Sequence, residues 1–112
     1  MLSEEENQSL TRVGPNEDAG AVLRRYWQPA ALSDELKSER PVVPVTLLGE
    51  KLVLFRDDDG ELGLIARKCP HRGADMCLGR LEDGGLRCPF HGWHFDRTGK
   101  CIEQPGEPEG SN

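Results

Sequence analysis

The chain has 112 residues, of which 36% are hydrophobic and 30% charged, with a net charge of −6 and a pI near 5.0. This length and balance suit one small globular domain, and the negative charge argues against nucleic acid and anionic membranes as partners, because like charges repel. The N-terminal segment lacks the pattern of a secretory signal, and no apolar run is long enough to cross a bilayer, so we expect a cytoplasmic protein.

Residues 1–30 form a predicted helical segment. Ser3 and Glu6 have the spacing of a capping box, and Gly14-Pro15-Asn16 would end this first helix. A second helix is expected from Ala19 to Tyr26, before Pro29. Its apolar residues recur at helical spacing and are expected to cover a core: Val22, Leu23, Tyr26 and Trp27.

Residues 31–104 have the pattern of short strands. A hairpin is expected from residues 42–48 and 51–56, with Gly49-Glu50 as its turn and Pro44 on an edge strand. A third strand follows over 61–67, and one or two short strands are expected between 74 and 87. Cys101-Ile102 would form the last strand, and residues 105–112 are predicted to be a flexible tail.

Two short segments within residues 69–91 carry the residues that can bind a metal. Cys69-Pro70-His71 and Cys88-Pro89-Phe90-His91 each offer one thiolate and one imidazole, in the pattern C-x-H-x16-C-x2-H. In an extended C-x-H segment both side chains point to the same side, whereas C-x-x-H reaches similarly through a turn. A glycine follows each pair, at Gly73 and Gly92, and permits the backbone to bend around a ligand. We therefore predict loops 69–73 and 88–93 as one binding site.

A single zinc ion is an alternative for such a ligand set. Zinc modules usually pair cysteine with cysteine and histidine with histidine, whereas here each pair is mixed. The third histidine, His94, would need a longer spacing, so we interpret it as an exposed strand residue. Cys77 and Cys101 are expected to be reduced thiols without a role in the site.

The motif and its continuation, CPFHGWHFD, resemble the Rieske iron–sulfur family. The segment LRRYWQP at residues 23–29 further resembles the N-terminal part of ring-hydroxylating oxygenase large subunits of the phthalate 4,5-dioxygenase type. The resemblance spans about Leu10 to Glu107 and the front quarter of such subunits. It implies an all-β Rieske fold of small antiparallel sheets, and a [2Fe–2S] cluster bound by Cys69, His71, Cys88 and His91.

The resemblance also implies one-electron transfer. A reductase or ferredoxin would supply the electron, and an oxygenase catalytic domain would accept it. That domain holds a mononuclear iron on two histidines and a carboxylate, which this chain does not offer, so the chain alone is not expected to hydroxylate a substrate. A threefold assembly is usual in the family. A stand-alone ferredoxin-like carrier and a non-redox zinc module remain the other two hypotheses.

A low reduction potential is a further implication. High-potential Rieske proteins have an additional disulfide, a serine and a tyrosine beside the cluster. The matching positions here are Ala74, Phe90, Trp93 and Phe95, which supply none of these groups. Because hydrogen bonds to the sulfurs stabilise the reduced state, we expect a potential of about −150 mV, at the low end of the Rieske range.

Overall fold

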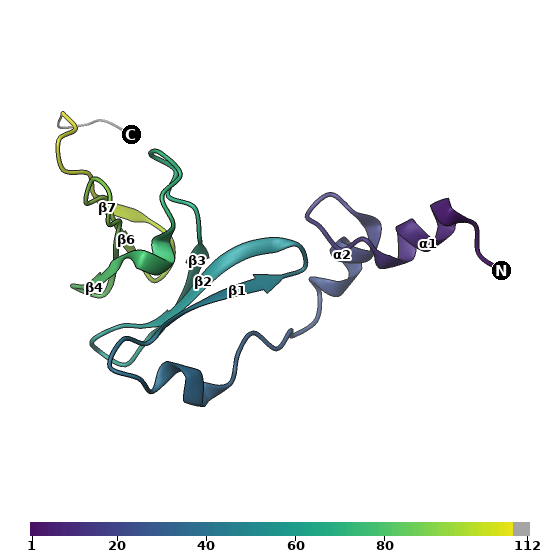
Figure 1. The fold of residues 1–112 in the computed structure, drawn as a ribbon, viewed down its shortest axis with the longest axis horizontal. Coiled ribbons are helices and arrows are strands. Elements are labelled where there is room, and N and C mark those ends of the chain that lie inside the picture. Colours follow the sequence, from purple (N-terminus) through teal and green to yellow (C-terminus); the bar gives the residue numbers. More distant parts are fainter. Residues whose placement is uncertain (109–112) are drawn as a thin grey trace.

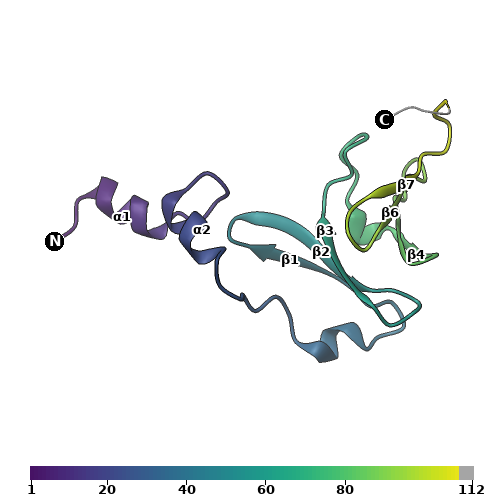
Figure 2. The ribbon, with the colours of Figure 1, turned by 180° about the vertical axis from the view of Figure 1, so that it is seen from behind.

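The computed structural model describes residues 1–108, which form two small antiparallel sheets preceded by two short helices (Figure 1). The helical segment projects from one end of the molecule, and the second sheet lies at the other end (Figures 1 and 2). In chain order the elements are α1 (Glu4–Thr11), α2 (Asp18–Leu23), the 3-10 helix η1 (Ser33–Leu36), β1 (Val42–Leu47), β2 (Glu50–Arg56), β3 (Leu62–Ala66), the 3-10 helix η2 (Met76–Leu78), β4 (Arg80–Glu82), β5 (Gly85–Arg87), β6 (His94–Asp96) and β7 (Cys101–Glu103).

The first helix begins at the predicted capping box. The Ser3 N–H donates to the Glu6 carboxylate at 2.8 Å, and the Glu6 N–H donates to Ser3 Oγ at 3.1 Å. These two bonds satisfy backbone donors that a helix start leaves free.

The second helix differs from the prediction in length and in exposure. It ends at Leu23, and the apolar residues expected to cover a core are exposed, with Trp27 at 101% and Tyr26 at 67% relative accessibility. Polar contacts hold this segment instead. The Arg24 guanidinium donates to the Val13 carbonyl at 3.0 Å and pairs with Glu50 at 2.8 Å. The prediction of a core role for these aromatic residues is therefore wrong.

The first sheet has the strand order β1-β2-β3, and the predicted hairpin and third strand are confirmed, although the turn lies one residue earlier than predicted and Glu50 already belongs to β2. Leu48 and Gly49 connect β1 to β2 with φ values of 50° and 80°, the backbone of a tight two-residue hairpin turn. Pro44 lies on β1, at the edge of the sheet, where its missing N–H costs no ladder bond.

The second sheet has the order β4-β5-β6-β7, so each strand pairs with its neighbour in the chain. Asp83 and Gly84, with φ values of 45° and 76°, make a second tight turn between β4 and β5. β5 then leads directly into the second predicted loop, and β6 leaves it.

The core places the two predicted loops at the seam between the sheets. Alternation along β2 directs Val53 and Phe55 to one face and Leu54 to the other. The first face belongs to the main core, whose buried members are Val42, Val53, Phe55, Ile65, Cys69, Met76, Leu86, Cys88 and Phe95. The predicted all-β fold is confirmed, and both motif cysteines are part of its core.

The tail after β7 is described as far as residue 108. The Glu107 N–H donates to the Gln104 carbonyl at 3.1 Å, which makes a turn. Residues 109–112 of the predicted tail lie outside the described residues. Within residues 1–108, no helix has the length and apolar character needed to cross a membrane.

Candidate metal centre

The first loop is a turn that the backbone closes twice. The Cys69 N–H donates to the Ala74 carbonyl, and the Gly73 N–H donates back to the Cys69 carbonyl, both at 2.8 Å. Gly73 has a φ of 77°, in the left-handed region that favours glycine. The extended segment expected for Cys69-Pro70-His71 is therefore not observed, because these two bonds curl the chain.

The second loop repeats the same turn. The Cys88 N–H donates to the Trp93 carbonyl at 2.7 Å, and the Gly92 N–H donates to the Cys88 carbonyl at 3.1 Å. Gly92 has a φ of 78°, matching Gly73. With the two turns aligned on their cysteines, His71 is the third residue of its turn and His91 the fourth. One backbone framework thus presents both imidazoles, from different positions.

The two motif cysteines lie beside each other in the core as free thiols. Cys69 is 1% and Cys88 5% exposed. Burial raises the pKa of the Cys69 thiol, and the neighbouring Cys88 thiol raises it further, while the backbone N–H groups of His71 and Arg72 lower it. These N–H groups favour a negatively charged sulfur, which is the form that binds a metal.

The two imidazoles also lie together, and each has an aromatic ring against its face. The ring centroids of His71 and His91 are 4.8 Å apart, with the planes at 75°. Trp93 stacks on His71 at 4.3 Å, and Phe90 stacks on His91 at 4.9 Å. The stacking restricts both rings, and Trp93 covers the His71 ring from one side. The indole N–H of Trp93 is buried and has no hydrogen-bond partner within residues 1–108.

The four side chains match the donors that a two-iron cluster needs. Such a cluster takes two thiolates on one iron and two imidazoles on the other. A pair of adjacent buried thiols beside a pair of adjacent imidazoles supplies these donors, so the side chains fit the group. Within the described part of the chain, no three His, Cys, Asp or Glu side chains converge on a single metal-ion position, whereas a two-iron cluster takes only two protein ligands at each iron.

The remaining candidates lie apart from this set. His94 is on β6 as predicted but is 2% exposed, with Nε2 2.7 Å from the Glu82 carbonyl, so the prediction of an exposed residue is wrong. Cys77 packs against the core, and burial raises the pKa of its thiol. Cys101 also packs against the core, and its Sγ lies 3.5 Å from the Glu103 carbonyl.

Two arginines that sequence reasoning missed hold the loops in place. Arg87 donates to the Gly92 carbonyl at 2.7 Å and pairs with Glu103 at 2.8 Å and Glu82 at 3.2 Å. The hydrogen bond to Glu103 raises the pKa of this guanidinium above its ordinary value. At the first loop, Arg67 on its N-terminal side pairs with Asp75 on its C-terminal side at 3.0 Å. Each loop is therefore flanked by an ion pair of its own. Nothing in the spacing of these residues signals the contacts.

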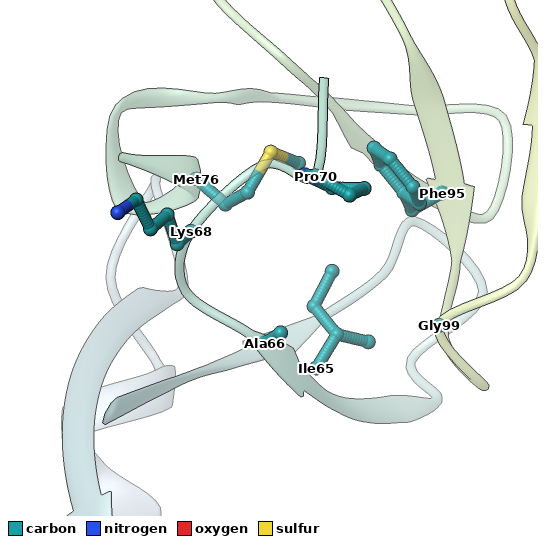
Figure 3. A pocket seen from close by; sticks show the side chains of 7 residues that line it. All are labelled: Ile65, Ala66, Lys68, Pro70, Met76, Phe95 and Gly99. Carbon is teal, nitrogen blue, oxygen red and sulfur yellow. The ribbon is translucent and has the colours of Figure 1, made fainter. Parts of the chain in front are cut away.

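An apolar pocket of about 150 Å³ lies beside the first loop (Figure 3). Its lining includes Ile65 of β3, Pro70 of the loop, Met76 of η2 and Phe95 of β6. The pocket therefore lies between the two sheets. Figure 3 shows the Lys68 side chain with its amine turned away from this pocket.

Paired turns that carry cysteine and histidine at the seam of two small antiparallel sheets define an iron–sulfur domain of the Rieske class. The sequence model of the Rieske [2Fe-2S] domain matches residues 26–110, and the chain belongs to this family. Its cofactor is accordingly a Rieske-type [2Fe–2S] cluster.

The relatives are oxygenase subunits. The chain is 51% identical to the 5,5'-dehydrodivanillate O-demethylase oxygenase subunit of Sphingobium sp. (strain NBRC 103272 / SYK-6), over 96% of this chain and 25% of the relative. It is 45% identical to the phthalate 4,5-dioxygenase oxygenase subunit of Pseudomonas putida, over 100% of this chain and 26% of the relative. The chain therefore spans about a quarter of the length of these relatives.

A solved structure agrees with these sequence matches. The chain matches apo dicamba monooxygenase with a TM-score of 0.70 and 39% identity, covering 80% of this chain and 27% of that one. The similarity therefore extends from sequence to fold.

Proposed function

We propose that this chain is the domain through which electrons enter an aromatic ring-hydroxylating oxygenase of the Rieske type. The observation that carries the proposal is the paired arrangement of two buried thiols and two imidazoles in matching turns. The similarity to oxygenase subunits over nearly the whole chain supports it. The comparison favours this function over a stand-alone carrier, because these relatives are about four times as long as the matched region.

We assign the ligands residue by residue. Cys69 and Cys88 would hold one iron and His71 and His91 the other, and the cluster would accept and release one electron at a time. The protein contributes N–H donors toward the Cys69 sulfur and aromatic rings that orient the imidazoles. Each imidazole binds a metal through one nitrogen, so its second nitrogen can hold a proton or donate a hydrogen bond to an acceptor.

Partners, boundaries and location complete the proposal. A reductase or ferredoxin would donate the electron, and an oxygenase catalytic domain would accept it. Residues 1–30 would form a helical N-terminal segment, 31–104 the Rieske domain and 105–112 a flexible tail. A cytoplasmic location is in keeping with four free cysteines, since a reducing compartment keeps thiols unpaired.

Metal analysis and spectroscopy of the chain test the function. The purified chain should contain about two irons and two labile sulfides and should absorb visible light, with a Rieske-type EPR signal after reduction. His71→Ala and His91→Ala should each remove that signal, whereas His94→Asn, the matched control, should keep it. A colourless chain that contains zinc would contradict the proposal, as would a normal signal in His71→Ala.

A further inference from the structure

A recess of about 210 Å³ opens beside the first cluster loop, and its lining is mainly basic. Lys51 comes from β2, Arg67 and Lys68 follow β3, and Gly73 and Asp75 complete the wall. The Arg67 N–H donates to the Lys51 carbonyl at 3.2 Å, which fixes the two neighbouring chains. The recess is therefore built on the sheet that leads into the site.

The charge in this recess is opposite in sign to that of the whole chain. Arg67 and Asp75 neutralise each other at 3.0 Å. Lys51 and Lys68 are exposed, and neither forms an ion pair with another residue in 1–108. Two uncompensated positive charges thus stand together in a chain with a net charge of −6.

One of these lysines lies directly against the cluster loop. A Cβ placed on Gly73 would be 2.8 Å from Lys68 Cε and 3.8 Å from Lys68 Nζ. The Gly73 N–H in turn donates to the carbonyl of Cys69, one of the assigned ligands. A group bound at this amine would therefore lie beside the turn that carries Cys69 and His71.

We propose that this basic recess is the docking site of an acidic electron-donor protein, whose surface carboxylates lie between Lys51 and Lys68. The inference rests on the function proposed above. The donor loses one electron and the cluster gains it, so docking beside the first loop shortens the path between the two centres. Opposite charges on the two surfaces also speed and orient the encounter.

The chemistry of the cations favours a protein surface over a small anion. A small carboxylate is bound most firmly by the planar fork of an arginine, and the Arg67 fork is already occupied by Asp75. The two free charges are lysine ammonium groups, which act as flexible point charges. They suit a broad and transient contact with several carboxylates.

The test measures electron transfer between the cluster-loaded chain and probes of opposite charge. The reduced chain is mixed in a stopped-flow instrument with ferricyanide, a trivalent anion, or with tris(phenanthroline)cobalt(III), a trivalent cation. The variant is Lys51→Gln/Lys68→Gln. The control, Arg12→Gln/Lys37→Gln, removes the same total charge at the end of α1 and after η1, away from the first loop (Figure 1).

A charge about 10 Å from a trivalent ion in water at about 0.1 M salt changes the rate roughly twofold, after screening. In the recess variant, electron transfer to ferricyanide should therefore be roughly fivefold slower, and electron transfer to the cobalt complex faster by a similar factor. The control should change either rate by less than about 1.5-fold. Reduction of the oxidised chain by a reduced, acidic plant-type ferredoxin should slow in the recess variant and not in the control.

Each other outcome decides against the inference. If the recess variant and the control behave alike with the ferredoxin, docking does not occur at this recess. If benzoate at constant ionic strength abolishes the difference between variant and wild type, the recess is a small-anion site. An unchanged visible spectrum and EPR signal in both variants separates these failures from a failure of the proposed function. A chain that forms no cluster overturns both.

Discussion

Replacing Arg87 by methionine should destabilise the protein by about 3 kcal/mol. The charge-assisted hydrogen bond to the Gly92 carbonyl contributes about 1.5–3 kcal/mol. The pairs with Glu82 and Glu103, which are 32% and 55% exposed, add up to about 1 kcal/mol each. The side chain is 14% exposed, and methionine retains most of its apolar stem in the same space.

Arg80→Met is the matched control. Arg80 pairs with the same Glu82 at 2.8 Å, but its side chain is 74% exposed and makes no hydrogen bond to the second loop. Its loss should cost less than about 0.5 kcal/mol.

Urea unfolding of the cluster-loaded chain, followed by far-UV circular dichroism, gives both differences from the midpoints. The rate at which visible absorption bleaches at one urea concentration gives a second readout. We expect Arg87→Met to bleach faster than Arg80→Met, because the second loop, which carries two of the proposed ligands, has lost its support. Equal midpoints for the two variants would refute the assignment of Arg87 as the support of that loop.

Four further predictions follow from individual contacts. Gly85→Ala should lower the free energy of unfolding by more than about 3 kcal/mol, because the new Cβ would lie 2.0 Å from the Phe95 carbonyl oxygen. Gly84→Ala, which has open space around it, should lower it by about 1–2 kcal/mol because its φ is 76°. Thermal unfolding of the two variants measures the difference. Arg67 holds the pKa of Asp75 below its ordinary value, so the folded pKa lies below the unfolded one and this stability is present above about pH 4 and lost as the pH falls through the folded value. Asp75→Asn, which removes a charge on a side chain 36% exposed, should lose about 1 kcal/mol at pH 7 and show a shallower loss of stability in acid; an unchanged pH profile would contradict this. His94→Asn should keep the cluster spectrum but lower the free energy of unfolding by about 1–3 kcal/mol, since a buried hydrogen bond is lost. The reduction potential should lie near −150 mV, and voltammetry that gives a clearly positive value would overturn the reasoning from missing sulfur donors.

The sequence predicted those parts of the fold that depend on local chemistry. The capping box at Ser3 and the tight hairpin turn at Gly49 are each specified by a few neighbouring residues. The cysteine, histidine and glycine spacing pointed to the segments 69–73 and 88–93, and each forms a turn closed by main-chain hydrogen bonds. In each case the residues that determine the structure are close together in the chain.

The errors concern burial, which depends on distant parts of the chain. Helical spacing identified an apolar stripe that included Trp27, but spacing does not say whether another element packs against it. His94 was interpreted as an exposed strand residue because its spacing does not fit the ligand pattern, and regular alternation would place it on the opposite face from Phe95. An irregular register between His94 and Phe95 breaks the alternation, so both neighbours are buried. The contacts of Arg87 depend on the pairing of β5 with its neighbours and leave no local pattern.

In the repeated turn of the two loops, the backbone hydrogen bonds that fix the turn do not involve the side chains that the turn carries. Each turn is closed by main-chain bonds of a cysteine and a glycine, and between them it carries a proline followed by two further side chains. In the first loop the third residue, His71, is the proposed ligand and Arg72 is the remaining side chain; in the second loop the fourth residue, His91, is the proposed ligand and Phe90, which stacks on it, is the remaining side chain. Arg72 and Phe90 are both exposed. Mutation of Arg72 can therefore change the surroundings of the proposed cluster while the ligands and the backbone stay as they are, whereas mutation of Phe90 also removes the ring that stacks on His91.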